Sequence, residues 1–164
     1  MKRVFIYAIT ALIMCSCVGA DDQDKKLAEE KAKELEATQL LTNELLPKMA
    51  KVTGMEVLHP VKVDVIDKAA MKDFMLKSLD QDFPGDELER MTEGFIMVGL
   101  FPDGFDLRNT FVELMLEQAG AFYDPRSKTY YGIIGLPEAL QNPATKRLLT
   151  AHELVHALQD QTVN

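Results

Sequence analysis

The strongest constraint on this chain is the segment 150–158, where two histidines stand four residues apart and a glutamate follows the first. His152, Glu153 and His156 form the pattern His-Glu-x-x-His. On an α-helix, residues four apart differ by only about 40° around the axis and by about one turn along it. The pattern therefore predicts a helix from which one metal ion can reach both imidazoles.

The residue types in this pattern favour zinc. Two imidazoles at this spacing are common zinc ligands, and Glu153 is poorly placed to bind the same ion alongside both. Zinc would lower the pKa of a bound water from about 16 to about 7, and Glu153 would take the proton and pass it to the leaving amine. The motif thus predicts His152 and His156 as zinc ligands and Glu153 as the catalytic general base of peptide-bond hydrolysis.

The residues around the motif are uncharged, as a buried helix requires, because an unpaired charge would be costly there. They are Thr150, Ala151, Leu154, Val155, Ala157 and Leu158. The alternative is that both histidines are ordinary, partly buried residues bonded to the backbone and that Glu153 lies on the surface.

A catalytic zinc site usually has a third protein ligand and one open position. The metzincin pattern is excluded, because Gln159 and Thr162 stand where it has glycine and histidine. His59 lies in a loop far along the sequence and is not expected to bind zinc. Asp160, one turn beyond His156, is better placed to hydrogen-bond a ligand or to brace the site. We therefore expect the third ligand outside this chain, as part of a longer protein.

Composition and charge limit the class of protein. The chain has 164 residues, 47% hydrophobic and 27% charged, which suits one globular domain with a core. Its formal net charge is -8. Because Lys2 and Arg3 belong to a predicted leader, the exported part is more acidic still. This balance argues against nucleic acid as a partner.

The N-terminus predicts export. Residues 1–20 have the basic start and apolar run of a signal peptide, and the run is too short to span a membrane. Small residues at 18–20 fit ordinary cleavage before Asp21, while 14–17 resembles a degraded lipobox with cleavage before Cys17. In the second case Cys17 carries a lipid. Both predict the cell envelope or periplasm, with a membrane contacted only through a lipid anchor.

Residues 21–52 are predicted to be helical in two parts. Positions 21–36 are mostly charged, which is typical of a solvated tether or surface helix. From Leu35 to Met49 an apolar stripe at helical spacing predicts a helix that docks on the domain, and Gly54 ends it. Both cysteines lie in or beside the leader, so the exported domain has no disulfide.

Residues 53–164 alternate between helix and strand patterns and predict an α+β fold. A strand is expected at 61–66 and a hairpin at 121–123 and 128–134. Its rings, Phe122, Tyr123, Tyr130 and Tyr131, are expected either to shape the substrate side or, for at least half of them, to pack in the core. A helix is expected at 68–79, where it buries Phe74 and Leu79. Two further helices are expected at 86–98 and 107–119, capped by Asp86 and Asp106. The last helix is expected from Asn142-Pro143 onward. The hairpin directly precedes the histidine helix. An exposed strand edge could therefore lie beside the metal and bind an extended peptide by strand addition.

Two resemblances extend this interpretation. Residues 151–160, AHELVHALQD, look like the active-site helix of thermolysin-like gluzincins, whose third ligand is a glutamate from a later helix. From about 53 to 161 the chain resembles a group of exported, mostly uncharacterised bacterial HExxH proteins with a pattern near GFYDP…AHELTHALQDQ. The matching pieces are 122–125, 151–161, 99–102 and 106–108, with Ala121 where the group usually has glycine. The group implies a zincin-like fold and a downstream glutamate ligand, and it says little about substrates.

The leading hypothesis is an exported zinc metallopeptidase that acts on peptides or proteins, of which 53–164 form the N-terminal part of a zincin-like domain. The competing hypothesis is a non-catalytic envelope lipoprotein that retains this fold to bind a partner or peptide.

Overall fold

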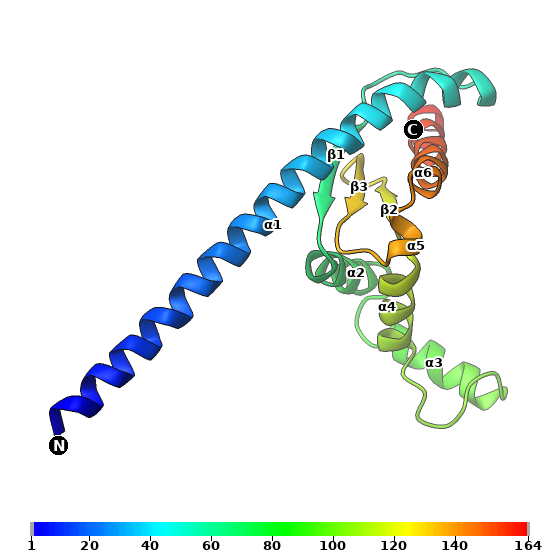
Figure 1. The fold of residues 1–164 in the computed structure, drawn as a ribbon. Coiled ribbons are helices and arrows are strands. Elements are labelled where there is room, and N and C mark those ends of the chain that lie inside the picture. The colour runs from blue at the N-terminus through cyan, green and yellow to red at the C-terminus, as the bar shows by residue number, and fades with distance from the viewer. Residues whose placement is uncertain (1, 164) are drawn as a thin grey trace.

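The computed structural model describes the backbone of residues 2–163 and the side chains of 22–137 and 140–162. The predicted signal peptide and the lipidation candidate Cys17 lie outside the described side chains. The elements in chain order are α1 (Lys2–Thr53), β1 (Lys62–Ile66), α2 (Lys68–Asp82), α3 (Glu87–Met97), α4 (Leu107–Gln118), β2 (Ala121–Asp124), β3 (Thr129–Ile133), α5 (Glu138–Gln141) and α6 (Pro143–Val163). The predicted α+β class is confirmed (Figure 1).

The three strands form one mixed sheet in the order β1-β3-β2. β3 is central, parallel to β1 and antiparallel to β2, with Tyr130 opposite Tyr123. The predicted hairpin is therefore present, and β2 is an edge strand. β3 therefore lies between β1 and β2, and α6 packs beside β2.

Two apolar clusters sandwich the sheet. On one face, Leu45 and Leu46 of α1 pack with Tyr130 and with Leu154 and Leu158 of α6. On the other face, Met71 of α2 packs with Ile133 and Leu136, joined by Phe122 and residues of α4. Neighbouring residues of a strand point to opposite faces, so Tyr130 points to the first cluster, whereas Tyr131 and its partner Phe122 on β2 point to the other face.

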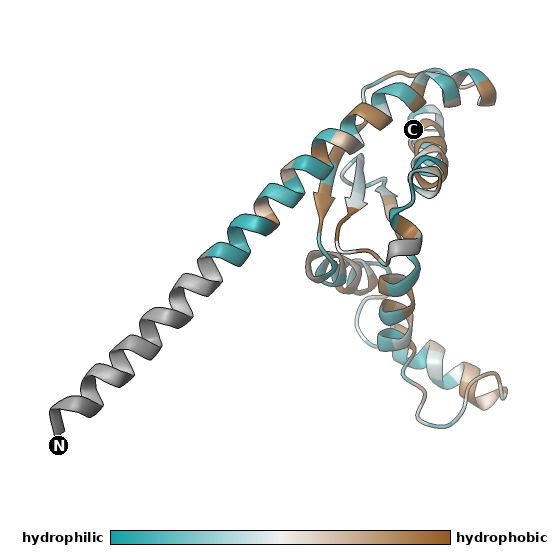
Figure 2. Ribbon diagram, viewed as in Figure 1, coloured by the Kyte–Doolittle hydropathy of each residue, from teal (hydrophilic) through white to brown (hydrophobic). Residues whose placement is uncertain are grey.

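The described part of α1 changes character along its length. It begins hydrophilic and gains hydrophobic residues where it passes the sheet (Figure 2). Thr42, Leu45 and Leu46 are buried against the domain. Three ion pairs fasten α1 further: Lys31 to Asp67 at 2.8 Å, Glu34 to Lys146 at 2.6 Å and Glu44 to Arg147 at 2.8 Å. Within the residues searched, no helix is long and apolar enough to cross a membrane.

Two local predictions need correction. Asp86 precedes α3, but its side chain makes no capping hydrogen bond and instead pairs with Arg90. Phe74 is only half-buried, whereas Met71, three residues earlier, is fully buried. The core face of α2 is thus centred on Met71 and Leu79, and the ring of Phe74 packs at a tilt against Phe122 at the border of an open pocket. The predicted caps Asp106 and Asn142 do accept backbone N–H groups.

Candidate metal-dependent active site

α6 carries both histidines of the motif on one exposed face. The Nε2 atoms of His152 and His156 lie 3.1 Å apart, and the two rings meet edge to face at 88°. Two nitrogens bound to one tetrahedral zinc at 2.0–2.1 Å would be about 3.3 Å apart. The pair therefore has the separation that a shared zinc ion requires.

Gln159 orients one of these rings. Its Oε1 lies 3.3 Å from Nδ1 of His156. An amide oxygen only accepts hydrogen bonds, so this contact favours the tautomer with the proton on Nδ1. The lone pair of Nε2 then points to the neighbouring imidazole, where a metal would bind.

Glu153 reaches sideways from α6 to the edge of the sheet. Its Oε2 accepts a hydrogen bond of 2.8 Å from the backbone N–H of Tyr123 in β2. Glu153 is half-buried, while His152 and His156 are exposed. The carboxylate is thus fixed beside the imidazole pair and separate from it, as a general base requires.

The same hydrogen bond identifies the side of β2 that faces away from β3. The N–H of Tyr123 points to Glu153 and away from β3, so Tyr123 and Tyr130 form a pair without mutual backbone hydrogen bonds. By the alternation of an antiparallel ladder, the backbones of Phe122 and Asp124 face β3, and those of Ala121 and Tyr123 face outward. The outward edge therefore runs beside α6.

Asp160 braces the hairpin against α6. It accepts hydrogen bonds from the hydroxyl of Tyr123 at 2.7 Å and from Nζ of Lys128 at 2.8 Å. Burial and this carboxylate raise the pKa of Tyr123, so its hydroxyl stays a donor. These contacts tie Tyr123 and Lys128 of the hairpin to α6.

Gln161 binds a loop that is distant in sequence. Its Oε1 accepts the N–H groups of Leu58 and His59 at 2.9 and 3.0 Å, and its Nε2 donates to the carbonyl of His59 at 3.0 Å. The fold thus brings His59 beside the end of α6, in a pocket shared with Asp160 and Lys128. The separation of His59 and Gln161 in sequence did not indicate this proximity.

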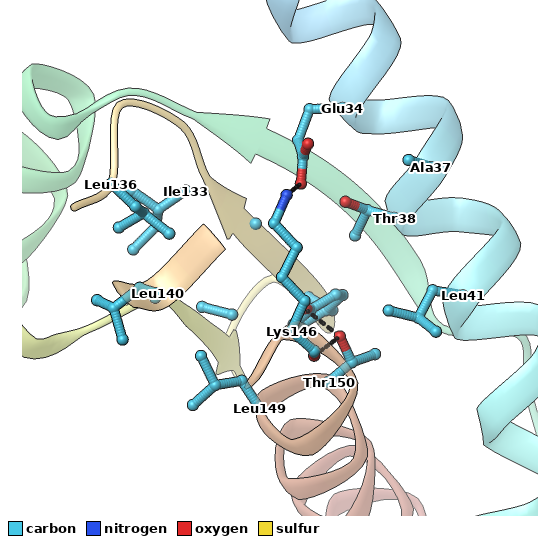
Figure 3. A pocket seen from close by; sticks show the side chains of 14 residues that line it. Glu34, Ala37, Thr38, Leu41, Ile133, Leu136, Leu140, Lys146, Leu149 and Thr150 are labelled. Atoms are coloured by element: carbon cyan, nitrogen blue, oxygen red, sulfur yellow. Dashed lines mark hydrogen bonds and ion pairs between the residues drawn. The ribbon is translucent and has the colours of Figure 1, made fainter. Parts of the chain in front are cut away.

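A separate pocket lies between α1, the sheet and the N-terminal half of α6 (Figure 3). Lys146 extends across its opening to Glu34, and Thr150 meets the hydroxyl of Tyr130 at 2.9 Å. Gly120 permits this close packing, because a Cβ there would lie 2.6 Å from Cδ1 of Leu149. The histidines and Glu153 do not line this pocket, which therefore belongs to the packing behind the site.

The donor set of the candidate site fits zinc in type and spacing, with two imidazole nitrogens and a carboxylate beside them. Among the described residues, no group of three or more His, Cys, Asp or Glu side chains is placed to hold a metal ion. The third ligand thus stays a prediction.

Comparisons with protein-family models, curated proteins and solved structures gave no match. The fold and the site therefore define the class directly: an α+β protein with a His-Glu-x-x-His helix against the free edge of a three-stranded sheet.

The sequence did not reveal three of the contacts that build this site. They are the N–H of Tyr123 on Glu153, the Lys128 pair with Asp160, and the Gln161 contact with the 58–59 backbone. The proximity of 122–125 to 159–161 depends on the packing of the hairpin against α6, which no local pattern encodes.

Proposed function

We propose that this protein is an exported zinc metallopeptidase with a zincin-like fold, with His152 and His156 as ligands and Glu153 as general base. The observation that supports this most directly is the convergence of the two Nε2 atoms at 3.1 Å beside a carboxylate held by a strand edge. Two ordinary histidines on an exposed helix face would not need their Nε2 atoms to converge.

Each residue would contribute a separate function. When bound, zinc would supply Lewis acidity for the scissile carbonyl and for water. Glu153 would accept a proton from water and deliver it to the leaving amine. The outward carbonyl of Tyr123 and the outward backbone groups of Ala121 would hold the substrate extended by strand addition, while the N–H of Tyr123 stays on Glu153. Gln159 would keep His156 in the tautomer that leaves Nε2 free to bind.

The full-length protein tests this assignment. We expect about one zinc per chain, lost in His152→Ala and His156→Ala. Glu153→Gln should retain zinc and the contact with Tyr123, because its amide oxygen still accepts the N–H. It should nevertheless lower the rate of peptide hydrolysis about 100- to 10,000-fold, the usual contribution of a general base.

Glu117→Gln is the matched control, because Glu117 is an exposed carboxylate on α4. Its metal content and hydrolysis should equal those of the unmodified protein. Undiminished cleavage by Glu153→Gln would refute the catalytic role. Selective peptide binding without hydrolysis would support the binding protein instead.

A further inference from the structure

An apolar pocket adjoins the same strand on the face opposite α6. α2, α4 and the β2–β3 turn enclose about 290 Å³, close to the lower limit of the range of about 300–1,000 Å³ for ligand pockets. Its apolar walls comprise Phe74, Met75, Leu79, Phe83, Phe111 and Phe122. Phe111 remains 40% exposed, so part of the wall is open to solvent.

The floor of this pocket is built by aromatic rings that support one another. Phe74 and Phe122 lie 4.9 Å apart between ring centroids, and Phe122 and Tyr131 lie 5.1 Å apart. Phe74 also contacts Tyr131 at 5.9 Å. These distances are typical of favourable ring packing, and the floor is therefore formed before any ligand binds.

The charged residues of the rim bind partners within the protein. Arg126 contacts Gln81 at 2.5 Å and Asp82 at 3.3 Å. Asp124 accepts the backbone N–H groups of Arg126 and Ser127, both at 3.1 Å. A charged ligand group entering the apolar part would lose water without gaining a dedicated partner. The pocket therefore favours a neutral, apolar group.

Tyr123 connects this pocket with the candidate active site. It lines the pocket, and its N–H binds Glu153. A peptide extended along the outward edge of β2 would alternate its side chains between the two faces of the sheet. Side chains on the face of Phe122 would then point to the pocket, and their neighbours would point to the face of Tyr123 and α6.

We propose that this pocket selects substrates with a large apolar side chain, aromatic or long aliphatic, beside the residue paired with Tyr123. The proposal rests on the proposed function, because it assigns the substrate class of that site. Peptides with a small or charged residue at this position bind more weakly.

The test measures peptide binding by the full-length protein carrying Glu153→Gln, which separates binding from turnover. The probes are fluorescent peptides that differ at one position, scanned along the peptide, with Phe, Leu, Ala or Glu. Ser78 lies half-buried on α2 in the pocket wall, so Ser78→Phe fills the space. It should weaken binding of the best Phe peptide about tenfold and leave the Ala peptide within about twofold.

Phe111→Ala is the second variant, because it removes an exposed wall residue at little risk to folding, and it should also reduce the preference for Phe over Ala. Leu114→Ala, on the same helix with 44% exposure and outside the pocket, should leave the preference unchanged. Thermal unfolding checks that each variant is folded.

Equal affinity for all peptides, or no binding at all, would overturn the pocket assignment. A Phe preference that survives both pocket variants would overturn it as well. Selective binding by this protein with no hydrolysis by the unmodified protein would refute the peptidase and leave the pocket assignment standing.

Discussion

At the residue scale, Glu153 shows the difference between a motif and a site. Its position after His152 suggested a base that does not bind the metal. What fixes the carboxylate is the N–H of Tyr123, thirty residues earlier, at 2.8 Å. The role follows from spacing on a helix, whereas the partner follows from a strand that packs beside that helix.

Tyr130 and Thr150 form a buried polar pair behind the site. The hydroxyl of Thr150 donates to the carbonyl of Lys146 at 2.8 Å, so the hydroxyl of Tyr130 must be the donor in their 2.9 Å contact. Burial raises the pKa of Tyr130 to about 12, which keeps this donor protonated at neutral pH. The pair ties β3 to α6.

We predict unequal effects of removing the two hydroxyls. Tyr130→Phe should lower the free energy of unfolding by about 1 kcal/mol, because Thr150 retains its bond to Lys146. Thr150→Val should cost about 1–3 kcal/mol, because it leaves the hydroxyl of Tyr130 buried without an acceptor. Urea unfolding of both variants measures the difference. Equal losses would contradict the inferred donor direction.

At the element scale, the hairpin and α6 were predictable, but their contact was not. Asp124 accepts two N–H groups of the turn, which explains why an Asp-Pro step can close this hairpin. Lys128 completes the turn with a φ of 56°, a left-handed conformation that is uncommon outside glycine, and its ammonium reaches Asp160. The turn thus also positions a cross-element ion pair.

Asp67 offers a test of how α1 and α2 are joined. It caps α2 by accepting the N–H of Ala70 at 2.8 Å and pairs with Lys31 of α1. Asp67→Ala should therefore cost about 1 kcal/mol for the cap and up to about 1 kcal/mol for the ion pair. Asp106→Ala removes a cap of the same kind on α4 and should cost only the first amount, because among the described side chains no ion pair joins Asp106 to α1. Equal losses would show that the ion pair adds nothing.

The same carboxylate predicts a pH dependence. The N–H of Ala70 and the ammonium of Lys31 hold the pKa of Asp67 below its ordinary value. A lowered folded-state pKa contributes stability that is present above the unfolded value and is lost as the pH falls through the folded value. The stability gap between the unmodified protein and Asp67→Ala should therefore shrink below about pH 4.

At the scale of the whole molecule, α1 and α6 meet on one face of the sheet, and their contact supports the candidate site from behind. Leu154 and Leu158 of α6 are fully buried against Leu45 and Leu46 of α1. The site face of α6 is exposed, so the burial of the opposite face determines where the histidines point.

Leu158→Ala should lower the free energy of unfolding by about 2–5 kcal/mol, because it leaves a cavity in this core. Leu148→Ala on the same helix, where Leu148 is 71% exposed, should change it by less than about 0.5 kcal/mol. Chemical denaturation of both variants checks this contrast. A small loss for Leu158→Ala would mean that α1 does not pack on α6 as described.

The sequence by itself determined the helix of the motif, its two candidate ligands and base, the hairpin and the α+β class, because these depend on spacing and periodicity within short segments. Only the tertiary structure decided that the free edge of β2 faces Glu153, that Gln161 binds the 58–59 backbone and that an apolar pocket adjoins the site. These features arise where segments distant in sequence are brought together by burying two faces of one sheet. The motif therefore predicts the chemistry, and the sheet edge beside it limits what the proposed site could reach.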